Sequence, residues 1–200
     1  VMTGSGWRIA RSPWRLGLMA ALVAAVLAGA VVAVGAAGGP PALSGSYGAY
    51  EPLAEPKPAP STAFLDPDGR PIKLDAYRGR IVLLNLWATW CAPCVKELPS
   101  LDRLQAALGG ERFQVLLVSV DRKGLEAAAP FLKRHGVEHL RTAADPKSEL
   151  ARAFGASGLP TSVLIDADGR IVGRMLGDAE WDSPEAKALI LHYLNKPEAT

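Results

Sequence analysis

Short apolar runs separated by turn residues fill the chain from about residue 61 onward. The run from Ile81 to Trp87 is almost continuously apolar, as is a second run from Val115 to Val120, and this pattern is typical of strands buried on both faces of a sheet. Between them, leucines recur at helical spacing from Cys94 to Leu108, where two glycines follow. The sequence therefore predicts a strand, a helix and a second strand in succession.

The remaining apolar pattern predicts further elements around this unit. They are a first hairpin at 64–65 and 72–74, a helix at 125–135, a strand at 139–142, a helix at 148–154, a second hairpin at 161–165 and 170–175, and a final helix that begins at Pro184 with Ser183 as its N-cap. Pro130 is expected to kink its helix or to lie in the first turn. This order predicts an α/β domain with a mixed sheet covered by helices on both faces.

The first forty residues have a different character. Leu16 to Val34 are 19 residues without a charge, which at about 1.5 Å per residue reach about 28 Å, close to the hydrocarbon thickness of a bilayer. Three arginines precede this run, so the positive-inside tendency leaves the N-terminus in the cytoplasm. We predict a basic cytoplasmic N-terminus at 1–15 and a single transmembrane signal anchor at 16–37. A cleaved signal peptide is the alternative, because small residues follow the apolar run.

Residues 38–60 are rich in Gly, Pro, Ala and Ser. Their six prolines exclude a regular helix or a central strand. We interpret this stretch as a semi-extended linker that leads to the domain at 61–200.

The formal net charge of +2 comes from 22 basic and 20 acidic residues. Arg8, Arg11 and Arg15 precede the first acidic residue, Glu51, so the rest of the chain has 19 basic and 20 acidic residues and a net charge of −1. A nucleic-acid-binding domain normally has a clustered basic face. The charge pattern therefore excludes nucleic acid as a partner.

The only two cysteines, Cys91 and Cys94, form a Cys-x-x-Cys pair between the first buried strand and its helix. A structural zinc site needs four ligands, and the three histidines have no zinc-finger spacing relative to the pair. A purely structural disulfide that closes so short a loop would restrict the unfolded chain very little. We therefore predict a redox-active pair and no metal site.

The two cysteines are expected to have different roles. At the helix N-terminus, the sulfur of Cys91 lies near unpaired backbone N–H groups and the positive end of the helix dipole, which favour the thiolate. Cys91 is therefore the predicted nucleophile. Cys94 lies one turn further along the helix and is expected to resolve the mixed disulfide that Cys91 forms.

The segment LNLWATWCAPCVKELP at 84–99 resembles the active-site segment of the membrane-anchored TlpA/ResA/CcmG group of the thioredoxin superfamily. The resemblance continues through GLPT at 158–161 and WDSPE at 181–185, so it covers about residues 60–195, and the later part is most similar to the TlpA branch. It implies a thioredoxin fold with an N-terminal hairpin extension. It also implies thiol–disulfide oxidoreductase activity without a cofactor.

The resemblance assigns further site residues. Pro160 is implied to be the cis-proline that lies against the disulfide, and Glu97 to be the group that accepts and returns the proton of Cys94. Thioredoxin has an aspartate six residues before its first cysteine, where this chain has Asn85, which cannot carry a proton. The expected substrate-binding set is completed by Trp90, Pro93 and Leu159.

The resemblance also implies a cellular setting. By this resemblance the chain is expected to be a single-pass protein of the bacterial inner membrane. Its periplasmic domain is expected to reduce protein disulfides during cytochrome oxidase copper-site or cytochrome c biogenesis. The implied partners are copper-site assembly factors or apocytochrome c as clients, and a membrane electron donor of the DsbD/CcdA type. Two alternatives stay open: a disulfide-donating oxidase or isomerase, which uses the same residues, and a Cu(I)-binding chaperone, because soft sulfur suits Cu(I).

Overall fold

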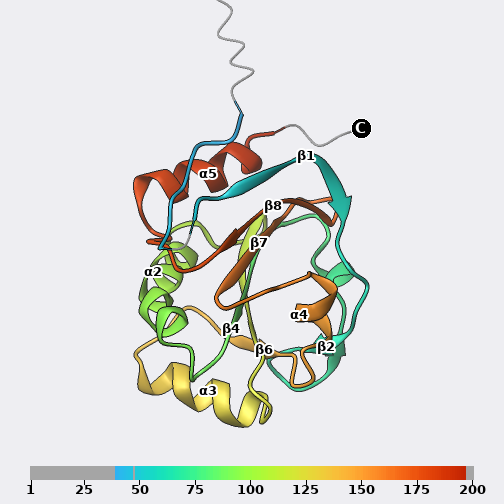
Figure 1. Cartoon of the computed structure of the whole chain (residues 1–200), viewed down its shortest axis with the longest axis vertical. Helices are drawn as coiled ribbons and strands as arrows, with labels where there is room; N and C mark the ends of the chain where they lie inside the picture. Colours follow the sequence, from blue (N-terminus) through green and yellow to red (C-terminus); the bar gives the residue numbers. More distant parts are fainter. Residues whose placement is uncertain (1–38, 47, 197–200) are drawn as a thin grey trace, which may run out of the picture. The chain divides into compact units, whose positions relative to one another are not determined.

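The computed structural model of the protein describes residues 39–46 and 48–196 (Figure 1). The predicted cytoplasmic N-terminus at 1–15 and signal anchor at 16–37 lie outside the described residues. Within the described ranges, no helix is both long enough and apolar enough to cross a membrane.

The described chain forms one sheet with helices packed on it (Figure 1). In chain order the elements are β1 (Glu51–Pro58), β2 (Phe64–Leu65), β3 (Pro71–Ile72), the 3-10 helix η1 (Leu74–Tyr77), β4 (Ile81–Trp87), α2 (Ala92–Leu108), β5 (Phe113–Ser119), α3 (Leu125–Arg134), β6 (Thr142–Ala144), α4 (Glu149–Ala153), β7 (Thr161–Ile165), β8 (Arg170–Leu176) and α5 (Pro184–Leu194). The strand order is β1-β8-β7-β4-β5-β6-β2-β3. Strands β4, β5 and β6 are parallel and the other neighbours are antiparallel, so the predicted mixed sheet is confirmed.

The alternation of side chains along β4 decides which helices they meet. Leu83 and Trp87 lie in the apolar cluster that includes α2, α3 and α5, whereas Leu84 and Leu86 lie in the cluster that includes η1 and α4. Helices therefore cover both faces of the sheet, as predicted. Asn85 comes between Leu83 and Trp87, so its side chain lies on the face that α2 covers.

Most predicted elements are confirmed to within a few residues. The side-chain oxygen of Ser183 accepts a 3.1 Å hydrogen bond from the N–H of Ala186, which makes Ser183 the N-cap of α5. Pro130 lies in the interior of α3 and not in its first turn. Each of the two hairpin loops contains a glycine with positive φ, which is 82° at Gly69 and 76° at Gly169.

The prediction of a linker up to residue 60 is wrong for its C-terminal part. Glu51–Pro58 forms the edge strand β1, antiparallel to β8, and the side chains of Leu43 and Tyr50 are buried. The hydroxyl of Tyr50 donates a 3.1 Å hydrogen bond to that of Tyr193 on α5. A proline-rich sequence excludes a central strand but is compatible with an edge strand, because the N–H groups on one side of an edge strand have no neighbouring strand to bind.

The predicted strand at 139–142 is displaced, since β6 begins at Thr142. The backbone N–H groups of Glu138 and His139 donate to the carboxylate of Asp102 on α2, at 3.3 and 2.7 Å. This backbone is therefore bound to a helix side chain and does not pair with the sheet.

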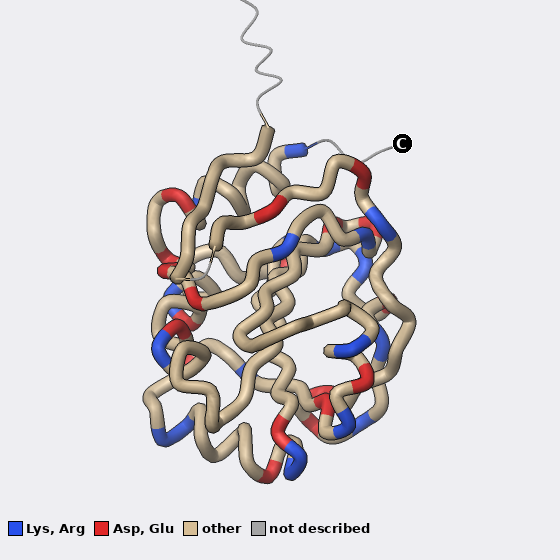
Figure 2. Tube along the Cα trace, in the orientation of Figure 1, with Lys and Arg blue, Asp and Glu red and all other residues tan. Residues whose placement is uncertain are grey.

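Basic and acidic residues are interspersed along the described trace (Figure 2). Several form ion pairs between distant segments, such as Arg103 with Asp182 at 2.6 Å and Arg141 with Asp68 at 2.6 Å. The mixed charge expected from the sequence thus extends over the folded domain.

Candidate active site

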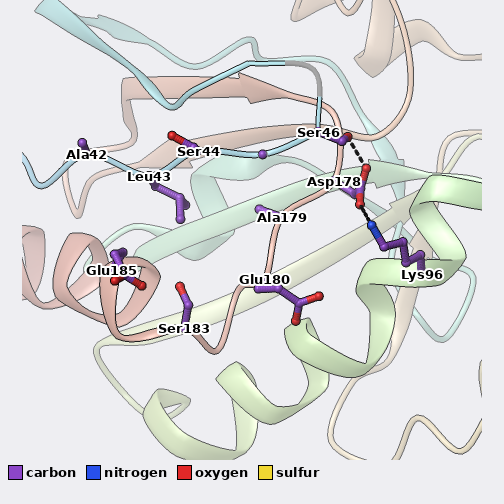
Figure 3. A pocket seen from close by; sticks show the side chains of 11 residues that line it. Ala42, Leu43, Ser44, Ser46, Lys96, Asp178, Ala179, Glu180, Ser183 and Glu185 are labelled. Carbon is purple, nitrogen blue, oxygen red and sulfur yellow. Dashed lines mark hydrogen bonds and ion pairs between the residues drawn. The ribbon is translucent and has the colours of Figure 1, made fainter.

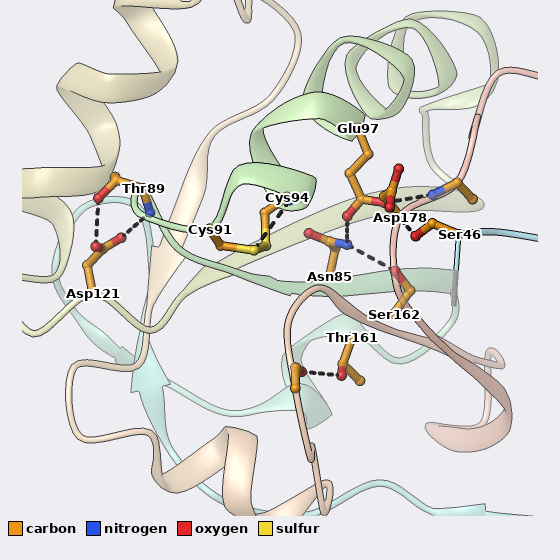
Figure 4. The surroundings of a disulfide bond; sticks show 12 residues. Ser46, Asn85, Thr89, Cys91, Cys94, Glu97, Asp121, Thr161, Ser162 and Asp178 are labelled. Atoms are coloured by element: carbon orange, nitrogen blue, oxygen red, sulfur yellow. Dashed lines mark hydrogen bonds between the residues drawn. A yellow bond between two sulfur atoms is a disulfide. The ribbon is translucent and has the colours of Figure 1, made fainter. Parts of the chain in front are cut away.

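Cys91 and Cys94 form a disulfide at the start of α2 (Figure 4). Cys91 is the N-cap of the helix, and its sulfur accepts a 3.3 Å hydrogen bond from the backbone N–H of Cys94. Cys91 is 6% exposed and Cys94 is 0% exposed, so Cys91 is the more accessible residue of the pair. Pro93 is half-buried in the first turn of α2. Among the described residues, no group of three or more His, Cys, Asp and Glu side chains is placed to bind a metal ion.

The turn between β4 and the disulfide is held by a buried aspartate that the sequence did not predict as part of the site. The carboxylate of Asp121 accepts hydrogen bonds from the Thr89 N–H at 2.9 Å, the Thr89 hydroxyl at 2.8 Å and the Ser119 hydroxyl at 2.7 Å. Trp90, the next residue of the turn, is 71% exposed directly before Cys91. Because β4 and β5 are parallel, their carboxyl ends meet at one edge of the sheet, and this topology is the signal that points to Asp121.

Glu97 is enclosed one turn beyond Cys94. It is 1% exposed, and its carboxylate accepts hydrogen bonds from the Asn85 amide at 2.8 Å, the Trp181 indole at 2.9 Å and the Ala179 N–H at 3.2 Å. Burial raises the pKa of Glu97 to about 7, although these three hydrogen bonds favour the ionised form and act against the rise. Glu97 is therefore not a solvated helix residue.

Asn85 lies between Glu97 and the disulfide (Figure 4). Its side-chain nitrogen donates to Glu97 Oε1 at 2.8 Å and to Ser162 Oγ at 2.9 Å. Ser162 is the residue opposite Asn85 in the β4–β7 pairing. Within the described residues, no hydrogen bond joins Glu97 directly to Cys94.

A loop after β8 closes the site around Glu97. Asp178 in this loop binds Lys96 Nζ at 2.8 Å and accepts a hydrogen bond from the Ser46 hydroxyl of the N-terminal segment (Figure 3). The ion pair holds the pKa of Asp178 below and that of Lys96 above the ordinary value. A cavity of about 440 Å³ lies beside the loop and is lined partly by Lys96 and Glu180. The sequence did not predict this enclosure, because it depends on contacts between distant segments.

Pro160 comes directly before β7, and the Leu159–Pro160 peptide bond is cis, as predicted. In the β4–β7 pairing Thr161 lies opposite Leu86, which places Pro160 beside the end of β4 and the turn that leads to the disulfide. Leu159 is half-buried and packs against both apolar clusters. The exposed side chain of Leu176 flanks this loop, where it approaches Gly158.

The comparisons with known proteins agree with this geometry. The redoxin family model matches residues 54–190. The thiol–disulfide oxidoreductase ResA of Bacillus cereus is 30% identical over 152 residues, which are 76% of this chain and 83% of the relative, and ResA of Bacillus subtilis is 29% identical over 156 residues, 77% of this chain and 83% of the relative.

Solved structures give the same result. A thiol:disulfide interchange protein of the thioredoxin family from Chlorobium tepidum has a TM-score of 0.58 and 28% identity, and the match covers 72% of this chain and 99% of that one. The lipoprotein thioredoxin Etrx1 from Streptococcus pneumoniae has a TM-score of 0.52 and 31% identity, with 66% and 96% covered. The chain therefore belongs to the redoxin family and is a thiol–disulfide oxidoreductase of the TlpA/ResA/CcmG-like thioredoxin group.

Proposed function

We propose that this oxidoreductase reduces disulfides of proteins outside the cytoplasm, with Cys91 as the attacking and Cys94 as the resolving cysteine. The observation that carries the proposal is the asymmetry of the pair. Cys91 is the more accessible residue, and its sulfur accepts a hydrogen bond from a backbone N–H at the helix N-terminus, whereas Cys94 is fully buried on the side of Asn85. Such N–H groups stabilise a thiolate, so Cys91 is the sulfur suited to attack a partner.

The reaction then has two exchange steps. The Cys91 thiolate attacks one sulfur of the client disulfide, and the other client sulfur leaves as a thiolate and takes up a proton. Cys94 next loses its proton, and its thiolate attacks the sulfur of Cys91, so that the bond to the client breaks and the second client sulfur leaves and is protonated. The client gains two electrons and two protons, and the chain ends as the Cys91–Cys94 disulfide.

Glu97 is the proposed acceptor of the proton that Cys94 loses. A general base works best when its pKa lies near the operating pH, and the pKa of Glu97 is raised to about 7 by burial. In the reverse step, when the disulfide is reduced again, the protonated carboxyl returns a proton to Cys94. We place Trp90, Pro93, Leu159 and the cis-proline Pro160 around the client segment.

We propose that the reaction takes place on the periplasmic side of the bacterial inner membrane. The support is the apolar run at 16–34 with arginines before it, which favours an anchor that leaves the catalytic domain outside the cytoplasm. The clients on this proposal are copper-site assembly factors of cytochrome oxidase or apocytochrome c. A membrane electron donor of the DsbD/CcdA type would return the chain to the dithiol.

The direction of electron flow is tested by the reduction potential of the full chain in detergent, equilibrated with glutathione or dithiothreitol buffers at pH 7. A value near about −270 mV, as in thioredoxin, supports a reductant, and a value near about −120 mV would make the chain a disulfide donor. The reduced chain should also reduce a disulfide-bonded client, and Cys91→Ser should abolish this reaction. The Cys94→Ser variant should stop at the mixed disulfide with the client.

The location has a separate test. Protease added to spheroplasts should digest the domain at 61–200 while the inner membrane is intact. Protection of the domain until the membrane is lysed would contradict a periplasmic location.

A further inference from the structure

The side-chain oxygen of Asn85 is the feature that the reaction above leaves unused. Asn85 is 0% exposed, and its Oδ1 has no hydrogen-bond partner among the described residues. A buried acceptor without a partner is unfavourable, and such groups are rare in folded proteins. The unpaired Oδ1 therefore needs a physical explanation.

The direction of this oxygen follows from the bonds of the same amide. Both hydrogens of Nδ2 are used, one by Glu97 and one by Ser162, so Oδ1 faces the opposite side. Figure 4 shows the disulfide on that side, with the Asn85 oxygen directed toward it. The chain is oxidised, and a disulfide sulfur has no hydrogen to donate.

We propose that Asn85 is a positioning residue whose Oδ1 accepts a hydrogen bond from the Cys94 thiol when the disulfide is reduced. Reduction adds two electrons and two protons to the disulfide, and one of the protons forms the S–H bond of Cys94. That S–H is the donor that Oδ1 lacks in the oxidised chain. The inference rests on the proposed function in one respect, namely that Cys94 is the resolving cysteine.

One amide then holds both partners of the proton transfer. Its oxygen binds the S–H of Cys94 and its nitrogen binds the carboxylate of Glu97, so the acid and the base of the resolving step are aligned on the same group. The amide itself carries no proton between them. At this position thioredoxin has an aspartate that can carry a proton, which Asn85 cannot. The arrangement gives Asn85 a different role, that of positioning the groups between which the proton moves.

The proposal also predicts an effect on the redox equilibrium. The reduced chain has a hydrogen bond that the oxidised chain lacks, so Asn85 favours the dithiol. In Asn85→Leu, which has no side-chain acceptor, the ratio of reduced to oxidised chain in a given dithiothreitol buffer should fall about tenfold. For a two-electron couple this fall corresponds to a reduction potential about 30 mV more negative.

The matched control is Asn195→Leu, which changes the only other asparagine of the chain, an exposed residue at the end of α5. Its ratio should equal that of the wild-type chain. If Asn85→Leu is folded by near-ultraviolet circular dichroism and also keeps the wild-type ratio, the proposal is overturned. Should this variant not fold, Asn85→Ala tests the same point, because it lacks the same oxygen.

The thiol hydrogen bond is measured directly by the infrared S–H stretch of Cys94 in the full-length Cys91→Ser chain, where Cys94 is the only thiol. A hydrogen bond to an amide oxygen lowers this frequency, so the band should lie below that of the Cys91→Ser/Asn85→Leu chain. A band at the frequency of a thiol without an acceptor overturns the proposal even if no Asn85 variant folds. The ratio of reduced to oxidised chain and the S–H frequency are compared between variants, so they do not depend on the client or on the absolute potential. The proposed direction of electron flow can therefore be wrong while the role of Asn85 is right, and the role of Asn85 can be wrong while the direction is right.

Discussion

The indole N–H of Trp181 donates a 2.9 Å hydrogen bond to Oε2 of Glu97, which lies 84 positions earlier in the chain. Burial raises the pKa of Glu97, and this hydrogen bond acts against the rise together with those from the Asn85 amide and the Ala179 N–H. A residue in the loop before α5 thus helps to set the protonation of the Glu97 carboxyl, which α2 carries together with Cys94. The pKa of Glu97 therefore depends on the correct folding of the loop between β8 and α5, which contains Trp181.

Trp181→Phe should raise the pKa of Glu97 by about one unit, because a hydrogen bond to a charged group contributes about 1.5–3 kcal/mol and one pKa unit corresponds to about 1.4 kcal/mol. The pH at which the resolving step reaches half its maximal rate should rise with it. Infrared titration of the carboxyl band and a pH–rate profile measure the two effects.

Trp87→Phe is the matched control, because the Trp87 indole is also fully buried but donates to the Thr142 hydroxyl at 3.1 Å. This variant should be less stable and leave the titration of Glu97 where it is. Equal shifts in Trp181→Phe and Trp87→Phe would mean that the effect comes from general loosening of the core.

The raised pKa of Glu97 also predicts how the stability of the oxidised chain depends on pH. The pKa rises from an ordinary 4.5 to about 7 on folding, so the folded chain binds this proton more tightly than the unfolded chain. The stability that results is fully present below about pH 4.5 and is lost as the pH rises through 7. The loss of stability amounts to about 3 kcal/mol. The Glu97→Gln chain should not show this pH-dependent loss, because its side chain at position 97 does not titrate.

Urea unfolding of the oxidised chain at pH 5 and pH 8 measures this difference. The free energy of unfolding of the wild-type chain should fall by about 2.5 kcal/mol more than that of Glu97→Gln between the two pH values, because the rest of the loss occurs below pH 5. Asp178 and Asp182 have lowered pKa values because of their ion pairs with Lys96 and Arg103, so their contributions are lost only at more acidic pH. Parallel pH dependence in the two chains would show that Glu97 has no raised pKa.

Local patterns made much of the fold and the redox pair predictable. The continuous apolar run of β4, the cysteines at a helix start and the cap at Ser183 each follow from neighbouring residues. The same holds for the hairpin turns. These predictions succeeded because backbone preference and burial agree over a few consecutive positions.

The enclosure of Glu97 could not be predicted in this way. Its distance along the helix from Cys94 is visible in the sequence, but its burial depends on Asn85 from β4 and Trp181 from a distant loop. Proline-rich composition is likewise compatible with a free linker and with an edge strand. The pairing of this segment with β8 and the contact of Tyr50 with Tyr193 on α5 distinguish them.

The Asp121 carboxylate is expected to control how the turn presents Cys91. Asp121→Asn weakens the acceptor for the N–H and hydroxyl of Thr89, so the turn should lose its defined geometry. The second-order rate constant for exchange of the reduced chain with a small aromatic disulfide should fall about tenfold, because small displacements of a reacting group have large effects on rate. Stopped-flow absorbance measures this rate.

Asp145→Asn is the control for this prediction. Asp145 is also buried, but its carboxylate accepts the N–H groups of Glu149 and Ala151 at the start of α4. This variant should lose stability and keep the wild-type exchange rate. If Asp121→Asn exchanges as fast as Asp145→Asn, the carboxylate of Asp121 contributes only to stability.

Tyr50 should stabilise the domain as a core residue, although it precedes the region of strongest apolar pattern. Its ring lies against Gly173 of β8, where a Cβ atom would overlap it, and its hydroxyl binds Tyr193. Tyr50→Phe should lower the free energy of unfolding by about 1 kcal/mol, and Tyr50→Ala by about 3–5 kcal/mol, because the second change also leaves a cavity. Urea unfolding of the oxidised chain, followed by circular dichroism, measures both values.

Glu55→Ala in β1, the strand that directly follows Tyr50, provides the comparison, since Glu55 is exposed and its loss should change stability by no more than about 0.5 kcal/mol. A chain shortened to start at residue 61 should be less stable than Tyr50→Ala, because it lacks β1 and the buried Leu43 as well as the tyrosine. If Tyr50→Ala and Glu55→Ala unfold at the same urea concentration, the segment at 43–58 is a linker that lies on the domain without stabilising it.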